Sequence, residues 1–384
     1  MLKPISPVLR TVTLFAVAAA LVVVFFALFY SNGSAGPEQR LDTAIAALAI
    51  VAGFAALVFL PMLPGLLELR RSADATSLTI DQNYSRDPRY MGKSFREKIS
   101  NVLQSAPMHT RMPFLNRSKE YGRIVPSLNL DDGENWTDAV LSKGAVTTGK
   151  RVHLVDLYAQ GDVRIGAGST LRALAADGDV QLESNVSVIR WIDGEKDVRV
   201  GPNANLGHSL SAVGAVELGN NVRFSRICGN PVVVGQPRVD RRGPAPDAGS
   251  WPLGNKRKTA TTTVTIGRGE SVETDLVTRS NVEVLEGGVV KGSIKGDDVI
   301  VGPNAVVYGN VVARGDVMVR DGGAIRGHVF AEGSVFLSRD SVVGSAGRSK
   351  TLYSSRNVEL ADGATVFGWV ICEGDGTTVS TSPG

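Results

Sequence analysis

Residues 298–315 read DVIVGPNAVVYGNVVARG, and residues 316–333 repeat the pattern as DVMVRDGGAIRGHVFAEG. The second phrase begins 18 positions after the first, and in each the apolar residues come in pairs two apart, such as Val299 with Val301. This spacing is typical of a strand, in which alternate side chains lie on opposite faces. A turn containing Gly, Asn or Asp recurs at every sixth position and ends each strand early. Three short strands in each repeat predict one coil of a β-solenoid.

The same pattern recurs in two blocks of the chain. In the second block the first apolar residue returns in steps of 18, 17, 18, 18 and 23 positions, at Val264, Val282, Val299, Val317, Val335 and Val358. In the first block it returns in steps of 17, 17, 18 and 18 positions, at Val146, Val163, Val180, Val198 and Val216, and Val234 could begin one more coil. The last gap of the second block contains Arg348–Ser355 and predicts an insertion. The sequence therefore predicts an all-β fold, a tandem β-helix with blocks at 145–235 and 263–373.

The composition agrees with this prediction and excludes several functions. The chain has 384 residues with 43 Gly and only 6% aromatic residues, as expected for a narrow apolar interior with a turn at every corner. A net charge of +3 gives no reason to expect nucleic acid as a partner. The two cysteines, Cys228 and Cys372, are too few for a disulfide framework or a metal site. We assign no metal-binding, cofactor-binding or catalytic residues.

Two apolar stretches near the N-terminus predict a transmembrane hairpin over residues 1–71. Residues 11–30 and 43–63 are each about 20 residues long and free of charge, enough to span a bilayer as a helix. Lys3 and Arg10 precede the first stretch and Arg70 and Arg71 follow the second, so both ends are expected in the cytoplasm. A cleaved signal peptide is the alternative for the first stretch. In either case the β-helix is expected on the cytoplasmic side of the membrane.

Three segments outside the repeats are expected to connect or end the blocks. Residues 72–144 form a basic connecting region with a short helix at Phe95–Leu103, which either contacts anionic lipid or is a solvated linker. Residues 236–262 read as a Pro-rich basic linker or loop. Residues 374–384 are expected to be a disordered tail. Candidate partner or lipid contacts in the linker are Arg238, Arg241, Arg242, Lys256, Arg257 and Lys258.

One family with coils of this length would make the protein an enzyme. Hexapeptide-repeat acyltransferases carry an aliphatic-Gly pair three times per coil, and resemblance to them would imply acyl-CoA chemistry with a His general base. Here such a pair occurs about once per coil, for example at Ile165-Gly166 and Val301-Gly302. His208 and His328 follow a Gly where an exposed turn residue is expected, and no orienting partner is visible in the sequence. We therefore prefer a non-enzymatic protein and keep the acyltransferase as the alternative.

A second family fits the second block better. One corner of its coils follows the pattern apolar-x-Gly-x-apolar, where x is a variable residue. The pattern occurs at residues 290–294 (VKGSI), 307–311 (VYGNV), 325–329 (IRGHV) and 366–370 (VFGWV). Together with the repeat period, this motif resembles the bactofilins, the bacterial polymer-forming cytoskeletal proteins. The resemblance is strongest over residues 264–373, and it implies a triangular right-handed β-helix, end-to-end assembly without nucleotide, and membrane association. The second solenoid block and the hairpin depart from the family's usual single solenoid between short tails.

The end of a solenoid is expected to assemble on physical grounds as well, because its last coil leaves a layer of backbone donors and acceptors unpaired. The last coil of the second block has its apolar residues at Val358, Leu360, Val366, Phe367, Trp369 and Ile371, which form either a polymerisation face or a closing cap. The sequence thus predicts a scaffold at the bacterial inner membrane that associates with itself and recruits partners such as envelope-building enzymes. A β-helical binding rod that does not polymerise is the other alternative.

Overall fold

A computed structural model describes residues 87–105, 107–113, 120–235 and 257–380. The chain divides into two compact units, residues 1–82 and 83–384, and all described residues belong to the second. The helices predicted at 11–30 and 43–63 lie outside the described residues. No helix within the described ranges is long and apolar enough to cross a membrane.

The first block is a β-solenoid whose strands stack in parallel on three faces, which we name A, B and C in chain order. Face A contains β3 (Leu128–Leu130), β6 (Val146–Thr148), β8 (Val163–Ile165), β10 (Val180–Leu182), β12 (Val198–Val200) and β14 (Val216–Leu218). Face B begins with β4 (Asn135–Trp136), and face C contains β2 (Tyr121–Val125), β5 (Ala139–Ser142) and β13 (Ser209–Ala212). Three longer strands run from face B into face C: β7 (His153–Ala159), β9 (Thr170–Ala176) and β11 (Ser187–Gly194).

The second block repeats this architecture. Face A contains β17 (Val264–Ile266), β20 (Val282–Val284), β23 (Val299–Val301), β26 (Val317–Val319), β29 (Val335–Leu337) and β32 (Val358–Ala361). Face B contains β18 (Ser271–Val272), β21 (Val289–Val290), β24 (Val306–Val307), β27 (Ala324–Ile325) and β30 (Val342–Val343). Face C contains β16 (Arg257–Ala260), β19 (Asp275–Thr278), β22 (Ile294–Gly296), β25 (Val311–Ala313), β28 (Val329–Ala331) and β31 (Lys350–Ser354). The predicted β-solenoid is confirmed, and its coils have the period of the sequence repeat.

Inward-facing apolar side chains fill the interior of the coils. Val299 stacks on Val317 and Val317 on Val335, and all three side chains are fully buried. The inward-facing apolar residues of both blocks form one continuous cluster, while outward-facing residues of face C form a second cluster with α5. Burying a side chain of this size contributes about 1.5–3 kcal/mol, so the repeated Val and Leu positions hold the stack together.

Two kinds of corner residue explain why each strand ends after only a few residues. The corner between faces A and B holds a left-handed residue, such as Asn203 (φ 58°) in the first block and Asn304 (φ 54°) in the second. Asn adopts this conformation more readily than most residues. At the corner between faces C and A, a carboxylate accepts the backbone N–H one coil later: Asp162 Oδ1 from Asp179, and Asp298 Oδ1 from Asp316, both at 2.9 Å. These side-chain bonds satisfy donors that the turns leave unpaired.

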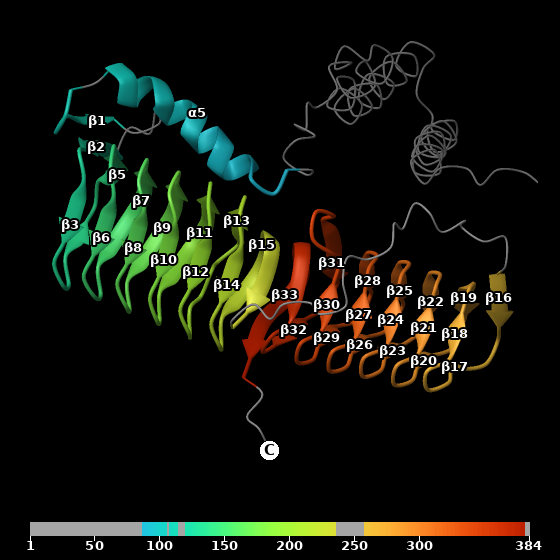
Figure 1. Ribbon diagram of the computed structural model, residues 1–384. Helices are drawn as coiled ribbons and strands as arrows, with labels where there is room; N and C mark the ends of the chain where they lie inside the picture. Colours follow the sequence, from blue (N-terminus) through green and yellow to red (C-terminus); the bar gives the residue numbers. More distant parts are fainter. Residues whose placement is uncertain (1–86, 106, 114–119, 236–256, 381–384) are drawn as a thin grey trace, which may run out of the picture. The chain divides into compact units, whose positions relative to one another are not determined.

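The two blocks meet at their C-terminal ends (Figure 1). The last strand of each block, β15 (Arg223–Val234) and β33 (Thr365–Val379), runs through all three faces of its own block. These two strands also pair with each other, and this pairing is antiparallel, with Ile227 opposite Val370 and Val232 opposite Val366. We call this contact the joint. Residues 236–256 therefore connect the joint to the opposite end of the second block, where β16 begins.

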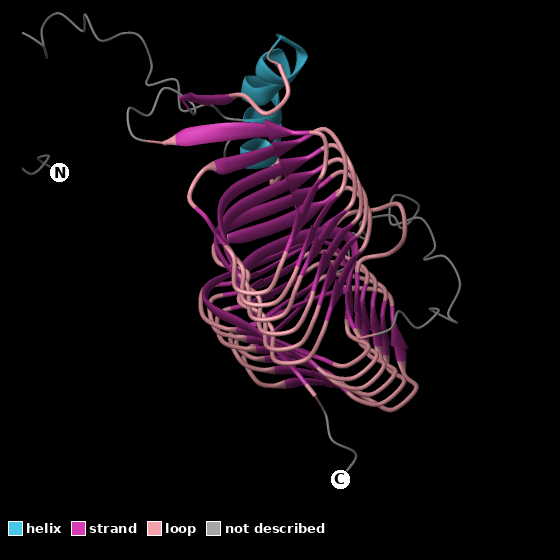
Figure 2. Ribbon diagram, turned by 90° about the vertical axis from the view of Figure 1, so that its left-hand side faces the viewer, coloured by secondary structure: helices cyan, strands magenta, loops and turns pink. Residues whose placement is uncertain are grey.

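One helix, α5 (Tyr90–Ser105), lies across face C of the first block (Figure 1). Figure 2 shows it beside the stacked strands, whose corners are formed by short loops. The apolar residues Phe95, Ile99 and Leu103 are buried against face C. The helix predicted at Phe95–Leu103 is therefore confirmed, and it packs on the solenoid.

The structure corrects several predicted boundaries. The first block begins at Tyr121 of β2, within the region expected to be connecting sequence. Its last face A strand begins at Val232 rather than Val234, since Val232 pairs with Val216. Residues 257–260 of the predicted linker form β16, and residues 374–379 of the predicted disordered tail belong to β33. The insertion predicted in the last gap is present, as a turn with a bridge between Ser345 and Arg348.

Candidate interaction surfaces

The six residues of the predicted self-assembly face lie at the joint or next to it. Val358 and Leu360 are buried in β32, and Val366 is buried in β33 opposite Val232 of the first block. Phe367 lies between Val366 and Gly368, while Trp369 lies opposite Cys228 and Ile371 opposite Arg226. This layer therefore pairs with the other block of the same chain. The sequence alone could not reveal this partner, because the whole second block separates the two strands along the chain.

Backbone and side-chain hydrogen bonds close the joint on both sides of its centre. On one side Thr378 Oγ1 donates to Gly219 O at 2.7 Å and accepts from Val222 N at 2.8 Å. On the other side Val234 N donates to Ala364 O at 3.1 Å, and Gly363 N donates to Val234 O at 2.9 Å. The joint therefore satisfies backbone groups that would otherwise stay exposed at two solenoid ends.

The two cysteines both belong to the joint and both are free. Burial raises the pKa of each thiol to about 12. The Cys372 thiol donates to Ser225 O at 3.2 Å. Since the thiolate is the reactive form, these thiols are poor nucleophiles at neutral pH, and their role is in packing.

The outer end of the second block has open strand edges. Among the described strands β16, β17 and β18 each pair on one side only, with β19, β20 and β21. Val264 N donates to Asn281 O, and Ile266 O accepts from Leu285 N, so both residues bond toward the interior of the stack. Because alternate residues of a parallel strand bond to opposite sides, the backbone N–H and C=O of Thr265 point away from the block.

The outer end of the first block is partly covered. The short strand β1 (Arg111–Pro113) pairs antiparallel with β2 and covers the edge of face C. Arg111 holds β1 there, because its guanidinium donates twice to the Asp138 carboxylate, each at 2.9 Å. These bonds lower the pKa of Asp138. An antiparallel strand that ends in proline is a common way to blunt a sheet edge.

A charged cluster fixes the N-terminal half of α5 to face C, and we call it the α5 clasp. Asp193 is only 1% exposed and accepts from Arg89 at 2.9 Å, from Arg96, and from Ser211 Oγ at 2.6 Å. Arg89 also binds Glu195 at 2.6 Å. This hydrogen bond is the main reason that the pKa of Glu195 is lowered. A buried carboxylate is tolerable only with such partners.

The clasp also contains the Asp177 carboxylate, the Tyr158 hydroxyl and an aromatic contact. Asp177 accepts from Arg96 at 2.8 Å and from the Tyr158 hydroxyl at 2.5 Å. Burial, followed by this hydrogen bond, raises the pKa of Tyr158. The ring of Phe95 packs edge-on against Trp191, with centroids 5.3 Å apart. Arg89 and Arg96 belong to the basic region expected to contact lipid or solvent, and in the structure they bind the protein itself.

The predicted partner or lipid contacts are only partly described. Arg238, Arg241, Arg242 and Lys256 lie outside the described residues. Arg257 and Lys258 lie in β16, where their backbones pair with Asp275 and Leu276, and the Lys258 side chain is exposed. Lys258 is therefore next to the open end of the second block.

Among the described residues, no carboxylate side chain is hydrogen-bonded to His208 or His328 as an orienting partner of a general base would be. His328 Nδ1 accepts the backbone N–H of Thr351 at 3.0 Å, and its ring stacks with Phe330 at 6.2 Å. Burial and the neighbouring Lys350 lower the pKa of His328. His208 is exposed on a corner, and its backbone N–H donates to Arg190 O. The contacts of both residues are those expected of residues in the turns between strands.

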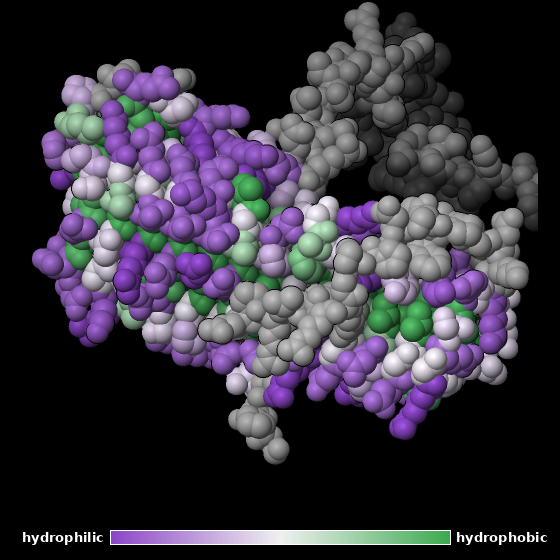
Figure 3. All heavy atoms as spheres, in the orientation of Figure 1, coloured by the Kyte–Doolittle hydropathy of each residue, from purple (hydrophilic) through white to green (hydrophobic). Residues whose placement is uncertain are grey.

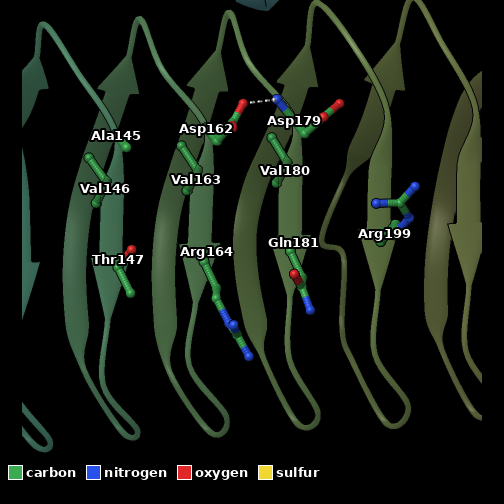
Figure 4. A pocket seen from close by; sticks show the side chains of 10 residues that line it. All are labelled: Ala145, Val146, Thr147, Asp162, Val163, Arg164, Asp179, Val180, Gln181 and Arg199. Atoms are coloured by element: carbon green, nitrogen blue, oxygen red, sulfur yellow. Dashed lines mark hydrogen bonds between the residues drawn. The ribbon is translucent and has the colours of Figure 1, made fainter.

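A shallow hollow of about 190 Å³ lies along face A of the first block (Figure 4). Its arginines are already paired: Arg164 binds Glu183 at 2.6 Å and Arg199 binds Glu217 at 3.1 Å. Figure 4 also shows the bond between the Asp162 carboxylate and the Asp179 backbone, which belongs to the corner ladder. The hollow therefore offers no unmatched positive charge, and we assign it no ligand.

Comparison of the chain with protein-family models, with curated proteins and with solved structures found no match.

Proposed function

We propose that the protein is a non-enzymatic scaffold of the bactofilin type, anchored in the bacterial inner membrane with both termini and the β-helix in the cytoplasm. In this proposal the solenoid associates end to end with further copies and recruits envelope-building enzymes. Support for the anchor comes from the two apolar stretches at residues 11–30 and 43–63, and support for the family from the Gly motif of the second block.

The observation that carries the proposal is the joint. Two solenoid ends of this chain pair through antiparallel strands over all three faces. An end of this architecture is thus able to bond to another end of the same kind. Among the described strands, β16, β17 and β18 have unpaired backbone groups along their outer edges, of the kind that are paired at the joint. These edges favour an equivalent contact between two copies.

The two outer ends of the chain lead to different assemblies. Contact between two open ends of the second block is isologous and gives a closed pair of chains. A filament requires the first block to join as well, through the edges of β3 and β4 that β1 leaves uncovered. We propose that the end of the second block makes the stronger contact, because no described strand pairs with the outer edge of β16, β17 or β18.

Analytical ultracentrifugation tests this proposal on two samples: the compact unit, residues 83–384, and the full chain in detergent. We expect the average mass to rise with protein concentration. Thr265→Pro removes a backbone donor that points out of the open end and should weaken association, whereas Thr265→Val keeps the donor and serves as the control. Circular dichroism must show that both variants fold. A wild-type protein that stays monomeric at all concentrations would contradict self-assembly and favour the non-polymerising rod.

A further inference from the structure

Face C forms one sheet that continues from the first block across the joint into the second. In the first block its outward residues Leu141, Tyr158 and Ala175 are neighbours on successive strands. The series continues to Cys228, which pairs with Trp369 of the second block. The first half of this sheet surface is covered by α5, and no described residues cover the second half in the same way.

The second half has a row of apolar side chains, which we call the face C ladder. Val312 pairs with Phe330, Phe330 with Tyr353, and Tyr353 with Ile371. Phe330 is 42% exposed and Val312 36%, which places both among the most exposed large apolar residues of the described chain. Figure 3 shows apolar atoms reaching the surface of the second block between polar turns. A contiguous apolar row on a solvent-facing sheet indicates an interaction surface.

The ladder corresponds to one row of the surface that binds α5. Leu141, Tyr158 and Ala175 each lie five positions before the first residue of the next face A strand. The four ladder residues lie at the same offset, before Val317, Val335, Val358 and Gly376. The second block therefore repeats one apolar row of the surface on which the first block binds a helix.

Two of the three acidic residues of the α5 clasp have counterparts in the second block as well. Asp177 and Glu195, which bind Arg96 and Arg89, lie three positions before the next face A strand. Glu332 and Glu373 occupy this offset beside the ladder, and both are exposed. No described basic side chain pairs with Glu332. At the other end of the row, Lys295 lies next to Val312 and is exposed.

The length of the surface also suits a helix. The 16 residues of α5 span about 24 Å at 1.5 Å per residue. Five strands from β22 to β33 span a similar distance, since neighbouring strands lie about 4.8 Å apart. A helix of about four turns would therefore cover Lys295 and the whole ladder.

We propose that face C of the second block binds an amphipathic helix of a partner protein. This helix has apolar residues at i, i+4 and i+8, as Phe95, Ile99 and Leu103 do in α5. It carries basic residues at the end near the joint, to pair with Glu332 and Glu373. The acidic pair opposes an anionic lipid surface, which is why a protein helix is the occupant we choose. The proposal gives the scaffold function a kind of partner, but it does not depend on self-assembly.

A labelled peptide of residues 87–105 has the required pattern and serves as the probe. Titrated with the full chain in detergent and followed by fluorescence anisotropy, it should bind saturably. Phe330→Glu puts a charge in the centre of the ladder and should weaken binding at least about tenfold. Ile189→Glu is the matched control, because Ile189 is an exposed apolar residue of the first block outside the α5 contact, and it should leave binding unchanged.

The ionic part of the site is tested separately. Glu332→Gln with Glu373→Gln should weaken binding of the peptide and reduce its dependence on salt. Absence of saturable binding would overturn the proposal, as would binding that survives Phe330→Glu, which would place the peptide on the first block. If Phe330→Glu changes only the sedimentation of the protein without peptide, the ladder binds a second copy and the proposal is wrong. Sedimentation of Thr265→Pro addresses the scaffold function independently.

Discussion

Cys228 of β15 lies directly opposite Trp369 of β33, at the centre of the antiparallel joint. Both strands are the last of their blocks, so the chain folds as two solenoids that meet at their C-terminal ends. Each solenoid thereby closes one end of the other. Within the part of the chain that the structure describes, unpaired strand edges remain at the N-terminal ends of the two blocks.

The Cys228–Trp369 pair allows the joint to be tested by a disulfide. Residues opposite each other in antiparallel strands have Cα atoms about 4.5–5.5 Å apart, within the range that a disulfide spans. We expect Trp369→Cys to form a disulfide with Cys228 within one chain under an added oxidant. Because the pKa of Cys228 is raised to about 12, the reaction should be slow at neutral pH.

Non-reducing electrophoresis and intact mass measure this outcome. The oxidised variant should run as a monomer and lose about two mass units, the two thiol hydrogens. Trp369→Cys with Cys228→Ser is the control and should not form the bond. Disulfide-linked dimers in place of monomers would show that block one of each chain joins block two of another.

Removal of an apolar anchor should release α5 and leave the solenoid intact. Ile99 is 1% exposed between the helix and face C. Ile99→Ala should weaken docking by about 3 kcal/mol, as large-to-small changes at buried sites do. Hydrogen exchange should accelerate in residues 90–105 and stay unchanged in strands β8 and β10. Lys98→Ala, at the exposed neighbouring position, should have an effect below about 0.5 kcal/mol; uniform acceleration throughout the chain would contradict local release.

The α5 clasp should matter more than the exposed ion pair on the same helix. Arg96→Met removes a shared partner from the Asp193 and Asp177 carboxylates and should cost about 3 kcal/mol. Lys93→Met breaks the exposed contact with Asp87 and should cost less than about 0.5 kcal/mol. Denaturant unfolding followed by the fluorescence of Trp191 measures both variants. Equal effects would show that the clasp does not depend on the buried carboxylates.

The repeat was readable from the sequence because every coil uses the same corner chemistry. The face A strands of the second block begin at Val264, Val282, Val299, Val317, Val335 and Val358, the residues that mark the period. The first coil of the first block does not show the repeat in its sequence, because its face A strand begins with Leu128 and is followed by an acidic loop. Thr378 falls in the segment predicted to be a disordered tail, because the Gly, Thr and Ser residues around it conceal a strand that pairs with β32.

The interaction surfaces were less readable than the coils. The end-to-end joint leaves no periodic pattern, since it pairs Arg223–Val233 with Thr365–Thr377 only once. The three apolar residues of α5 predicted the helix correctly, but nothing local indicated that Arg96 would reach Asp193, far along the chain in another coil. The face C ladder becomes visible only when successive coils are aligned in space, because its residues are 18 to 23 positions apart.

Acid should loosen the α5 clasp. The folded pKa of Glu195 is lowered, mainly by its hydrogen bond to Arg89. Its contribution to stability is therefore present above the unfolded pKa, about 4.3 for Glu, and is lost as the pH falls through the lower folded value. We expect the docking of α5 to weaken progressively as the pH falls below the unfolded value. The fluorescence of Trp191, with the other tryptophans replaced by Phe, reports the loss of its contact with Phe95.

Glu195→Gln is the control for this acid transition. The amide cannot titrate, so the variant should have a weaker clasp at neutral pH and a smaller further change on acidification. An equal response to acid in the natural protein and in Glu195→Gln would show that Glu195 does not link protonation to docking of the helix.

The left-handed corner position should accept glycine and reject a branched side chain. Asn304 has φ 54°, and the equivalent corners of the neighbouring coils hold Gly287 (φ 66°) and Gly322 (φ 63°). We expect Asn304→Gly to change the free energy of unfolding by less than about 0.5 kcal/mol, and Asn304→Val to lower it by about 2 kcal/mol, since a β-branched residue fits this conformation poorly. Val306→Thr on the adjacent strand, where backbone geometry is ordinary, should be close to neutral. If Asn304→Val were as stable as Asn304→Gly, then the corner would tolerate another conformation, and the Gly and Asn residues that recur there would not be what holds the coils in register.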